Sequence, residues 1–331
     1  MAYTVGDTIS NSDYNGLLNN TASGTPNTGV AARGINYIAG TGAGEHGLGQ
    51  TELSTVGATD TITAAQWNSL FTFMNNIQNH TNVTALTSTT AAAAGDVIAI
   101  KAALETDLTA LAAAVAGGST STLATEPTVA QVTSTASGRY AGSHIVEQSI
   151  TFTNANQMRW FFNAGGRIQI NVTRTGNGGA SATSKDTSVS DLITALGDFK
   201  IGQTTSTRTG SGETTTGSDL NKGMRDLTTD YQTILLLTQD SGTYTTMNFK
   251  IEAKLNAAVD SATVLTVQTS ILDPDAGDGE FTAGNTASVD QFANFIGVTN
   301  VILKFVNPTT ANGLAVVYTP STSAQVTNSI A

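Results

Sequence analysis

Residues 247–255 read Met-Asn-Phe-Lys-Ile-Glu-Ala-Lys-Leu, and this stretch decides the fold class. Apolar and polar residues alternate along it, which is the pattern of a strand with one buried face and one wet face. Residues 168–172 show the same alternation, and 265–271 continue in the same sense. Strands of this kind are typical of antiparallel sheets, so we expect residues 126–331 to form an antiparallel β-sandwich-like domain.

Three neighbouring segments complete this expected domain. Residues 234–237, Ile-Leu-Leu-Leu, are apolar at consecutive positions, which favours a strand covered on both faces, one of them by another subunit. Residues 190–196 end at a glycine and predict one short helix. Residues 202–219 are rich in Thr, Ser and Gly and predict a long surface loop.

The composition excludes several classes of function. Only 12% of the 331 residues are charged, the formal net charge is -11, and the 14 Lys and Arg residues form no basic stripe. Nucleic-acid binding by phosphate contacts is therefore disfavoured. The chain contains no Cys, which excludes disulfides, thiolate metal sites and Cys nucleophiles. The sequence shows no signal peptide and no apolar stretch long enough for a membrane span.

Two helix starts near the N-terminus are predicted from a degenerate repeat. Ser10 precedes Asp13 and Thr63 precedes Gln66 by three positions, which approximates a capping box. In a capping box the hydroxyl accepts a hydrogen bond from a backbone amide, and the third-position side chain bonds back to the cap. Each pair therefore indicates the first turn of a helix.

Both helix starts also carry the pattern of a hydrophobic staple. Ile9 is followed by Tyr14, and Ile62 by Trp67, in each case across the cap. Apolar residues then recur at helical spacing and predict a buried face formed by Leu70, Phe71, Met74 and Ile77. We expect residues 1–84 to form a small helical attachment module in which Trp67 is a core residue.

A connecting helix with its linker is predicted over residues 85–125. The helix begins at Asp96 and ends at Gly117 and Gly118. Its apolar stripe consists of Val97, Ile100, Leu104, Leu108, Leu111 and Val115. The spacing suits a nearly straight seam between identical helices, so we expect self-association in a stalk, with packing on the chain's own core as the alternative.

Two motifs resemble ligand sites but are better explained by loops. Residues 42–47 match the dinucleotide-binding pattern G-x-G-x-x-G, yet residues 48–57 lack the helical periodicity that a bound pyrophosphate requires. We interpret this segment as a glycine-rich connecting loop. Asp273, Asp275 and Asp278 lie in a segment that departs from the EF-hand pattern. We predict a polar turn there, with calcium ligation by these three residues as the alternative.

An aromatic run stands out in the predicted β domain. Trp160, Phe161 and Phe162 are followed by Gly165 and Gly166, which permit a tight turn into the next strand. We expect these aromatic side chains to pack in a core rather than to stack on a ligand.

Two parts of the chain resemble virion structural proteins of tailed bacteriophages, of the marine and cyanobacterial type. Residues 157–168, Gln-Met-Arg-Trp-Phe-Phe-Asn-Ala-Gly-Gly-Arg-Ile, are similar to the FFNAGG segment of such proteins. Residues 13–15, 47–50 and 62–70, together with His80, are similar to an N-terminal module in the same group. The resemblance implies a location in the virion and transfers no catalytic residue.

The combined prediction is a mainly β, α+β chain that acts as a non-enzymatic structural protein of a tail, neck, fibre or baseplate. We expect it to be assembled in the host cytoplasm, to form a homo-oligomer, as a trimer, and to bind other virion proteins. We expect no cofactor. The alternatives are a receptor-binding adhesin that recognises host-surface glycan and a capsid decoration protein. The residues expected to carry assembly are Tyr14, Trp67, Phe71, Val97, Ile100, Leu104, Leu108, Leu111 and Val115.

Overall fold

The computed structural model contains helices and antiparallel sheets, as expected for an α+β chain with mainly sheet content. It describes residues 10–18, 34–81, 86, 101–117, 129–140, 143–175, 184–240, 245–272, 295–308 and 320–328. The chain divides into two compact units. The helical unit comprises Met1–Glu126, Ala155–Gly166 and Asn307–Tyr318, and the sandwich unit comprises Pro127–Asn154, Arg167–Val306 and Thr319–Ala331.

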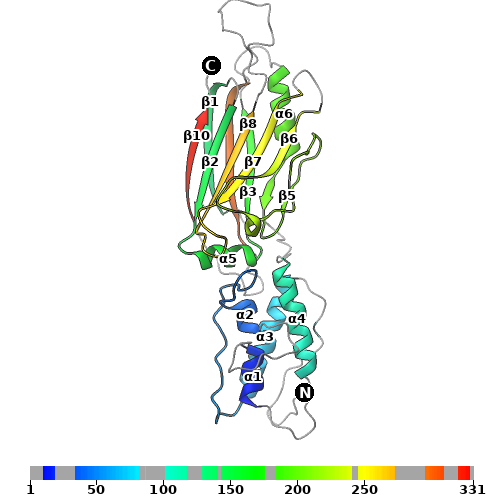
Figure 1. The fold of residues 1–331 in the computed structure, drawn as a ribbon, viewed down its shortest axis with the longest axis vertical. Helices are drawn as coiled ribbons and strands as arrows, with labels where there is room; N and C mark the ends of the chain where they lie inside the picture. Colours follow the sequence, from blue (N-terminus) through cyan, green and yellow to red (C-terminus); the bar gives the residue numbers. More distant parts are fainter. Residues whose placement is uncertain are drawn as a thin grey trace, which may run out of the picture. The chain divides into compact units, whose positions relative to one another are not determined.

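Five α-helices belong to the helical unit in the part of the chain that is described (Figure 1). They are α1 (Asn11–Leu18), α2 (Ile35–Ala39), α3 (Ala64–Thr81), α4 (Lys101–Ala116) and α5 (Ala155–Asn163). None of the described helices combines the length and the apolar character needed to cross a membrane.

The predicted capping box is complete at α3, and at α1 the bond from the third-position amide to the cap hydroxyl is present. The Thr63 amide donates to Gln66 Oε1 at 2.9 Å, and the Gln66 amide donates to Thr63 Oγ1 at 3.2 Å. The Asp13 amide donates to Ser10 Oγ at 3.2 Å. Each hydroxyl thus satisfies a backbone donor that has no partner within its helix. The reciprocal pair at α3 confirms that Gln at the third position supports the helix start.

The predicted apolar face of α3 is confirmed as core. Leu70, Met74 and Ile77 are fully buried, and Trp67 keeps 1% of its surface exposed. The Trp67 ring lies 6.2 Å from the Tyr14 ring and meets the Phe71 ring edge-on at 5.8 Å, measured between centroids. Aromatic pairs of this geometry add to the free energy gained from burial.

Helix α4 packs inside the helical unit, against α2 and α3. Its stripe residues Leu104, Leu108, Leu111 and Val115 are fully buried in the same core as Trp67. Self-association of α4 through this stripe would need these side chains at the surface. The structure instead has the alternative arrangement, in which the stripe packs on the chain's own core. Residues 101–116 are therefore part of the helical core rather than of a separate connecting segment 85–125. Val97 and Ile100 lie outside the described residues.

The sandwich unit consists of two five-stranded antiparallel sheets within the described residues. The first sheet has the order β1 (Val129–Tyr140), β9 (Phe295–Val306), β3 (Arg167–Thr175), β4 (Phe199–Ile201) and β5 (Ser206–Arg208). The second has the order β10 (Ser321–Asn328), β2 (Ser143–Thr151), β8 (Val264–Leu272), β7 (Asn248–Leu255) and β6 (Gln232–Thr238). A further helix, α6 (Ser184–Leu196), extends the predicted 190–196 helix towards the N-terminus and contacts strands of both sheets.

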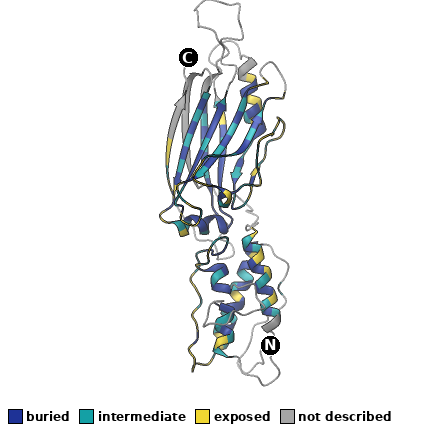
Figure 2. Cartoon of the chain, viewed as in Figure 1, coloured by how far each residue is buried: buried dark blue, intermediate teal, exposed yellow. Residues whose placement is uncertain are grey.

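Alternating burial along the strands places the sandwich core, as Figure 2 shows for β7 and β2. In β7 the residues Phe249, Ile251, Ala253 and Leu255 are buried, while the polar residues between them are partly exposed. The predicted strands at 247–255, 168–172 and 265–271 are present as β7, β3 and β8, and their predicted apolar residues are buried. The alternation with exposed residues is confirmed in β7, whereas Gln169 of β3 and Thr266, Thr269 and Ser270 of β8 are buried as well.

Strand β6 is covered along its outer edge by its own chain. Segment 214–219 runs beside it, where the Asp219 amide donates to the Ile234 carbonyl at 2.9 Å and the Thr214 and Thr238 backbones exchange hydrogen bonds. A register shift between Thr233 and Leu235 accompanies the consecutive burial of residues 234 and 235. Coverage by another subunit, as expected for 234–237, is not needed to explain the burial of Ile234, Leu235 and Leu237, and Leu236 is partly exposed. Within the predicted loop 202–219 the structure also has strand β5.

The aromatic run 160–162 lies in helix α5, which corrects the prediction that 190–196 is the one helix in the region from residue 126 onward. Helix α5 ends in a Schellman motif, in which the Gly166 amide donates to the Phe161 carbonyl at 2.8 Å and the Gly165 amide to the Phe162 carbonyl at 3.0 Å. Gly165 has φ of +92°, a conformation that glycine adopts readily. Phe161 and Phe162 are fully buried, as expected for core aromatics.

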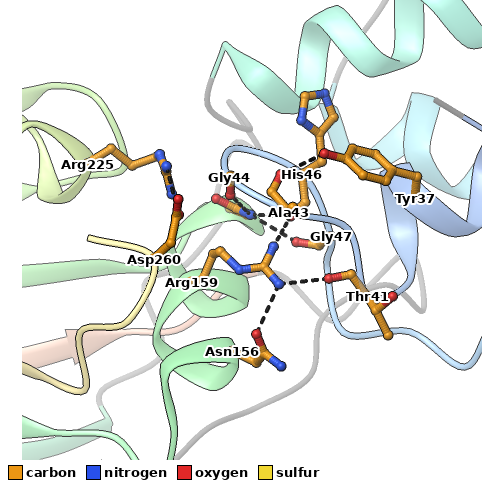
Figure 3. Close-up of polar contacts among 11 residues, drawn as sticks. Tyr37, Thr41, Ala43, Gly44, His46, Gly47, Asn156, Arg159, Arg225 and Asp260 are labelled. Atoms are coloured by element: carbon orange, nitrogen blue, oxygen red, sulfur yellow. Dashed lines mark hydrogen bonds and ion pairs between the residues drawn. The ribbon is translucent and has the colours of Figure 1, made fainter. Parts of the chain in front are cut away.

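A short 3-10 turn, Met224–Asp226, completes the regular structure of the sandwich unit. The Gly223 amide donates to Asp226 Oδ2 at 2.9 Å, and Arg225 forms an ion pair with Asp260 at 3.0 Å. Figure 3 includes this pair.

Candidate functional site

The residues expected to carry assembly are core residues wherever the structure describes them. Tyr14, Trp67 and Phe71 from α1 and α3 join the α4 stripe in one apolar cluster, and none keeps more than 3% of its surface exposed. The structure brings these residues together in the core, where they stabilise the helical unit and are not exposed at its surface. A docking surface of this unit must use other residues.

The calcium alternative concerns Asp273, Asp275 and Asp278, which lie outside the described residues. In the described part of the chain, no three His, Cys, Asp or Glu side chains are grouped in a way that could hold a metal ion.

The most elaborate polar arrangement joins α5 to the glycine-rich loop 40–50 within the helical unit (Figure 3). The amides of Gly47, Leu48 and Gly49 donate to carbonyls at the end of α2 and just after it, at 3.0–3.1 Å. Gly42, Gly44 and Gly47 all have positive φ, which allows the loop to fold back in this way. The loop amides are thus directed at α2, and several loop carbonyls are directed at α5.

Arg159 of α5 binds two of these carbonyls through its guanidinium. Nη1 donates to the His46 carbonyl at 2.5 Å, and Nη2 donates to the Thr41 carbonyl at 2.7 Å and to Asn156 Oδ1 at 3.1 Å. Arg159 is only 5% exposed. The rigid fork of the guanidinium lets one side chain fix two points of the loop.

Asn163, one helical turn after Arg159, binds the same loop. Its Nδ2 lies 2.8 Å from the His46 carbonyl oxygen, 3.1 Å from that of Gly47 and 3.3 Å from that of Gly44. Asn163 is fully buried. Its position at i+4 from Arg159 places both side chains on one face of α5.

The indole of Trp160 completes the contact between α5 and the loop. Its Nε1 donates to the Thr41 carbonyl at 3.2 Å, so Thr41 receives hydrogen bonds from two α5 side chains. On the other side of Thr41, its amide and hydroxyl donate to Glu52 Oε1 at 3.2 and 2.7 Å. Both ends of this residue are therefore fixed. We call α5, loop 40–50 and these contacts the α5 clasp.

His80 connects the end of α3 to the end of α5. Its Nε2 lies 2.7 Å from the Ala164 carbonyl oxygen, and the imidazole is fully buried. Burial lowers the pKa of His80 from its ordinary value of 6.5, and the hydrogen bond to Ala164 acts in the opposite direction. The neutral imidazole is thus the form that fits this position.

Two asparagines hold the segment that follows the loop. Asn36 exchanges two hydrogen bonds with the Leu53 backbone, and Asn15 does the same with the Val56 backbone, all at 2.8 Å. Residues 50–57 are thereby fixed in an extended path without secondary structure of their own. Backbone groups that lack a strand or helix partner are satisfied by these amide side chains.

The direction of the hydrogen bonds in the α5 clasp distinguishes between a phosphate site and a connecting loop for the G-x-G-x-x-G segment 42–47. A phosphate site needs backbone amides and a helix N-terminus directed at the anion. Here carbonyl oxygens of residues 41–47 converge on the guanidinium of Arg159 and the amide of Asn163. The loop therefore binds the guanidinium of Arg159 through its carbonyl groups. This geometry supports the interpretation of the segment as a connecting loop.

Arg159 and Asn163 were missed as functional residues at the level of sequence. The spacing of Met158, Phe161 and Phe162 is the i, i+3, i+4 pattern of a helix, and it was the available signal for α5. The loop carbonyls that these two side chains bind carry no sequence signal, because every residue has a carbonyl group.

Comparisons with protein-family models, with curated proteins and with solved structures give no match for this chain.

Proposed function

We propose that this chain is a non-enzymatic structural protein of a tailed-phage particle, in a tail, neck, fibre or baseplate, and that it acts by docking and assembly. One observation carries the proposal. The segments that resemble phage virion proteins are far apart in sequence, yet they contact one another in the helical unit. Residues 158–166 bind the loop that ends in 47–50, and His80 binds Ala164.

The contact between the resembling segments supports the proposal, because the resemblance then concerns one folded unit and not several unrelated stretches of sequence. A chance likeness of short segments would have no reason to fall on the two sides of a single contact. Arg159 and Asn163 lie within one resembling segment and His46 lies directly before another, and both side chains donate to the His46 carbonyl, at 2.5 and 2.8 Å. The helical unit is accordingly the part that we assign to attachment within the particle.

The proposed partners are other virion proteins and further copies of the same chain. The stripe residues within α4 and Ile234, Leu235 and Leu237 of β6 are buried within the chain, so they do not select a trimer. Oligomerisation in this proposal follows from the repeated architecture of a particle, in which a component occupies symmetry-related positions.

Immunogold electron microscopy tests the location. An antibody against the purified full-length chain is applied to intact phage particles, with pre-immune serum as the control. The proposal expects gold particles on one substructure, at positions repeated by its symmetry. Protein that sediments apart from the particles, with no labelling above the control, would contradict it.

A pair of variants tests the assigned attachment role. Arg159→Ala weakens the α5 clasp, whereas Lys222→Ala removes a partly exposed partner of Asp219 in the sandwich unit. Particles assembled with Arg159→Ala should carry less of the chain, and those with Lys222→Ala the normal amount. Equal incorporation of both, with the clasp shown to be weakened by melting, would count against attachment through the helical unit.

A further inference from the structure

The second sheet of the sandwich ends in an open edge at β10. Among the strands that the structure describes, β10 is hydrogen-bonded only to β2, and it lies at the margin of the sandwich in Figure 1. In an antiparallel sheet, every second residue of such a strand directs its backbone N–H and C=O groups away from its single neighbour. About half of the backbone groups of β10 are therefore directed away from the sheet.

The other sheet edges are protected in ways that β10 is not. Segment 214–219 is hydrogen-bonded along β6, and β5 is three residues long, with the Ser206 amide donating to the Leu220 carbonyl at 2.9 Å. Strand β1 begins with a register shift between Val129 and Gln131. Proteins use coverage, short strands and bulges of this kind to prevent pairing with other chains.

Strand β10 has no such device in its own sequence or register. Residues 321–328 read Ser-Thr-Ser-Ala-Gln-Val-Thr-Asn, with no charged residue and no proline. Their register with β2 is continuous from Ser321 to Asn328. A regular, uncharged edge of this length is a template on which another strand can pair.

The core-facing side of β10 is incompletely covered. Gln148 of β2 is 2% exposed and donates to the Val301 carbonyl of the other sheet at 3.4 Å, so it faces the core. Ala324 pairs with Gln148 and lies on the same side of the sheet, yet Ala324 is exposed. Ser321 and Ser323, on the opposite side, are exposed as well. A further strand beside β10 would cover Ala324 with its own side chains.

We propose that β10 pairs in antiparallel fashion with β10 of a second copy of this chain, so that the second sheets of two copies form one continuous sheet. In the register centred on Ala324, this residue lies opposite its own equivalent. Thr322 of each copy lies opposite Val326 of the other, and Ser323 lies opposite Gln325. Every pair is neutral, and residues of the core-facing side remain opposite one another.

The charge of the chain favours a second copy at this edge over other parts of the surface. Two chains with a net charge of -11 repel each other, so they approach most easily where charged residues are absent. A strand that pairs with its own equivalent forms an isologous contact, which closes after two subunits. Strand β1 ends the first sheet and lies beside β10, so the same twofold axis would bring the two β1 strands together.

The inference names a surface for the self-association included in the proposed function, but it is drawn from the sandwich unit alone. It is tested on the free protein, away from any particle. Its failure would therefore leave the location in a virion untouched, and absence of gold labelling on particles would leave the β10 contact untouched.

Light scattering on a dilution series of the full-length protein measures the association. The expected result is a species of twice the chain mass that dissociates on dilution. Ser321→Lys combined with Ser323→Lys places four ammonium groups along the joined strands and should weaken dimerisation by at least about tenfold. The matched control is Thr205→Lys combined with Thr207→Lys, at exposed positions with the same spacing at the β5 edge. It should dimerise like wild type.

Crosslinking provides an independent test, because the chain contains no cysteine. Opposite Cα atoms of an antiparallel pair are about 4.5–5.5 Å apart, a distance that a disulfide can span. Ala324→Cys should therefore give a disulfide-linked dimer on mild oxidation, and adding Ser321→Lys and Ser323→Lys should abolish it. Ala258→Cys, at an exposed position between β7 and β8, is the control and should stay monomeric.

The proposal is overturned if wild-type protein is monomeric throughout the dilution series, or if the β5 control weakens association as much as the β10 variant. Equal crosslinking at positions 324 and 258 would also overturn it, because random collisions would then explain the disulfides. Association that is lost in the β10 variant, without crosslinking at 324, would overturn the register centred on Ala324. Melting temperatures establish whether both lysine variants are folded, and the comparison of the two cysteine variants decides the question even if a lysine variant is not.

Discussion

The side chain of Asn163 donates to the carbonyl oxygen of His46, 117 residues earlier, at 2.8 Å. The same carbonyl accepts a hydrogen bond from Arg159, so one loop oxygen is bound by two side chains of α5. Both donors are at most 5% exposed. Buried polar contacts of this kind are stabilising only while each partner is present, which makes the α5 clasp a sensitive place for substitutions.

Arg159→Ala should lower the free energy of unfolding of the helical unit by about 2–4 kcal/mol, because buried carbonyls lose a charged donor. Arg159→Lys should recover only a part of this loss, since an ammonium group cannot donate in a fork. Both tryptophans of the chain, Trp67 and Trp160, belong to the helical unit, so tryptophan fluorescence during thermal unfolding reports on this unit. Lys222→Ala is the control, and a comparable loss there would contradict the assignment.

Substitution of the two glycines after α5 should be destabilising for different reasons. Gly165→Ala places a side chain at φ of +92°, which costs about 1 kcal/mol, and Gly165→Asn should be milder. Gly166→Ala should cost more, because its Cβ would lie 2.5 Å from the Phe161 carbonyl oxygen and 2.7 Å from the Phe161 ring. Denaturant titration of the three variants gives the order. If Gly166→Ala were as stable as wild type, the Schellman motif would not have the described geometry.

Trp67→Ala should reduce the stability of the helical unit by about 3–5 kcal/mol, the usual cost of removing a buried tryptophan. Trp67→Phe should cost less because it keeps an aromatic ring between Tyr14 and Phe71. Trp160 remains as the fluorescent reporter in both variants. Calorimetry should show no change in the unfolding of the sandwich, and a change there would mean that the two units do not unfold separately.

Acid should destabilise the helical unit through His80. Burial lowers the pKa of this imidazole in the folded state, so the unfolded state binds the proton more readily. The stabilising contribution is therefore present above the ordinary pKa of 6.5 and is lost as the pH falls below it. His80→Gln can still donate to the Ala164 carbonyl and carries no titratable group. Its melting temperature should depend less on pH between about 7 and 5 than that of wild type. Parallel curves for the two proteins would exclude His80 as the cause.

Local patterns predicted many of the elements because they depend on neighbours in sequence. Thr63 and Gln66 mark the start of α3 through contacts three residues apart, and the alternation in 247–255 marks β7 through its two faces. Trp67 was expected in the core for the same reason, and it is 1% exposed. Such patterns depend only on residues within one helical turn or one strand, so they can be recognised without knowing the rest of the fold.

The partners of these elements were harder to predict. The α4 stripe has the same spacing whether it faces another copy or its own chain, and only the presence of α2 and α3 beside it decides between the two. Helix α5 was missed because three consecutive aromatics, 160–162, favour a strand by intrinsic preference. The contact of Arg159 with the His46 carbonyl could not be read from the sequence, since any backbone carbonyl would have served equally well.

The outer face of the first sheet shows the same difference between local and long-range information. Alternation along 168–172 was sufficient to place Gln169 away from the core, but not to show which strands lie on its two sides. Strand β9 pairs with β3 although they are separated by more than a hundred residues, and β4 approaches from the other side. The row formed by Lys304, Gln169 and Lys200 follows from the register of these pairings.

The two units are connected more than once by the polypeptide. The chain passes from one unit to the other after Glu126, Asn154, Gly166, Val306 and Tyr318. A protease that cuts at a single one of these places leaves the other passages covalently intact, so neither unit is released as a fragment. Limited digestion of this protein should therefore produce nicked molecules that remain together under native conditions and separate into pieces only in denaturant.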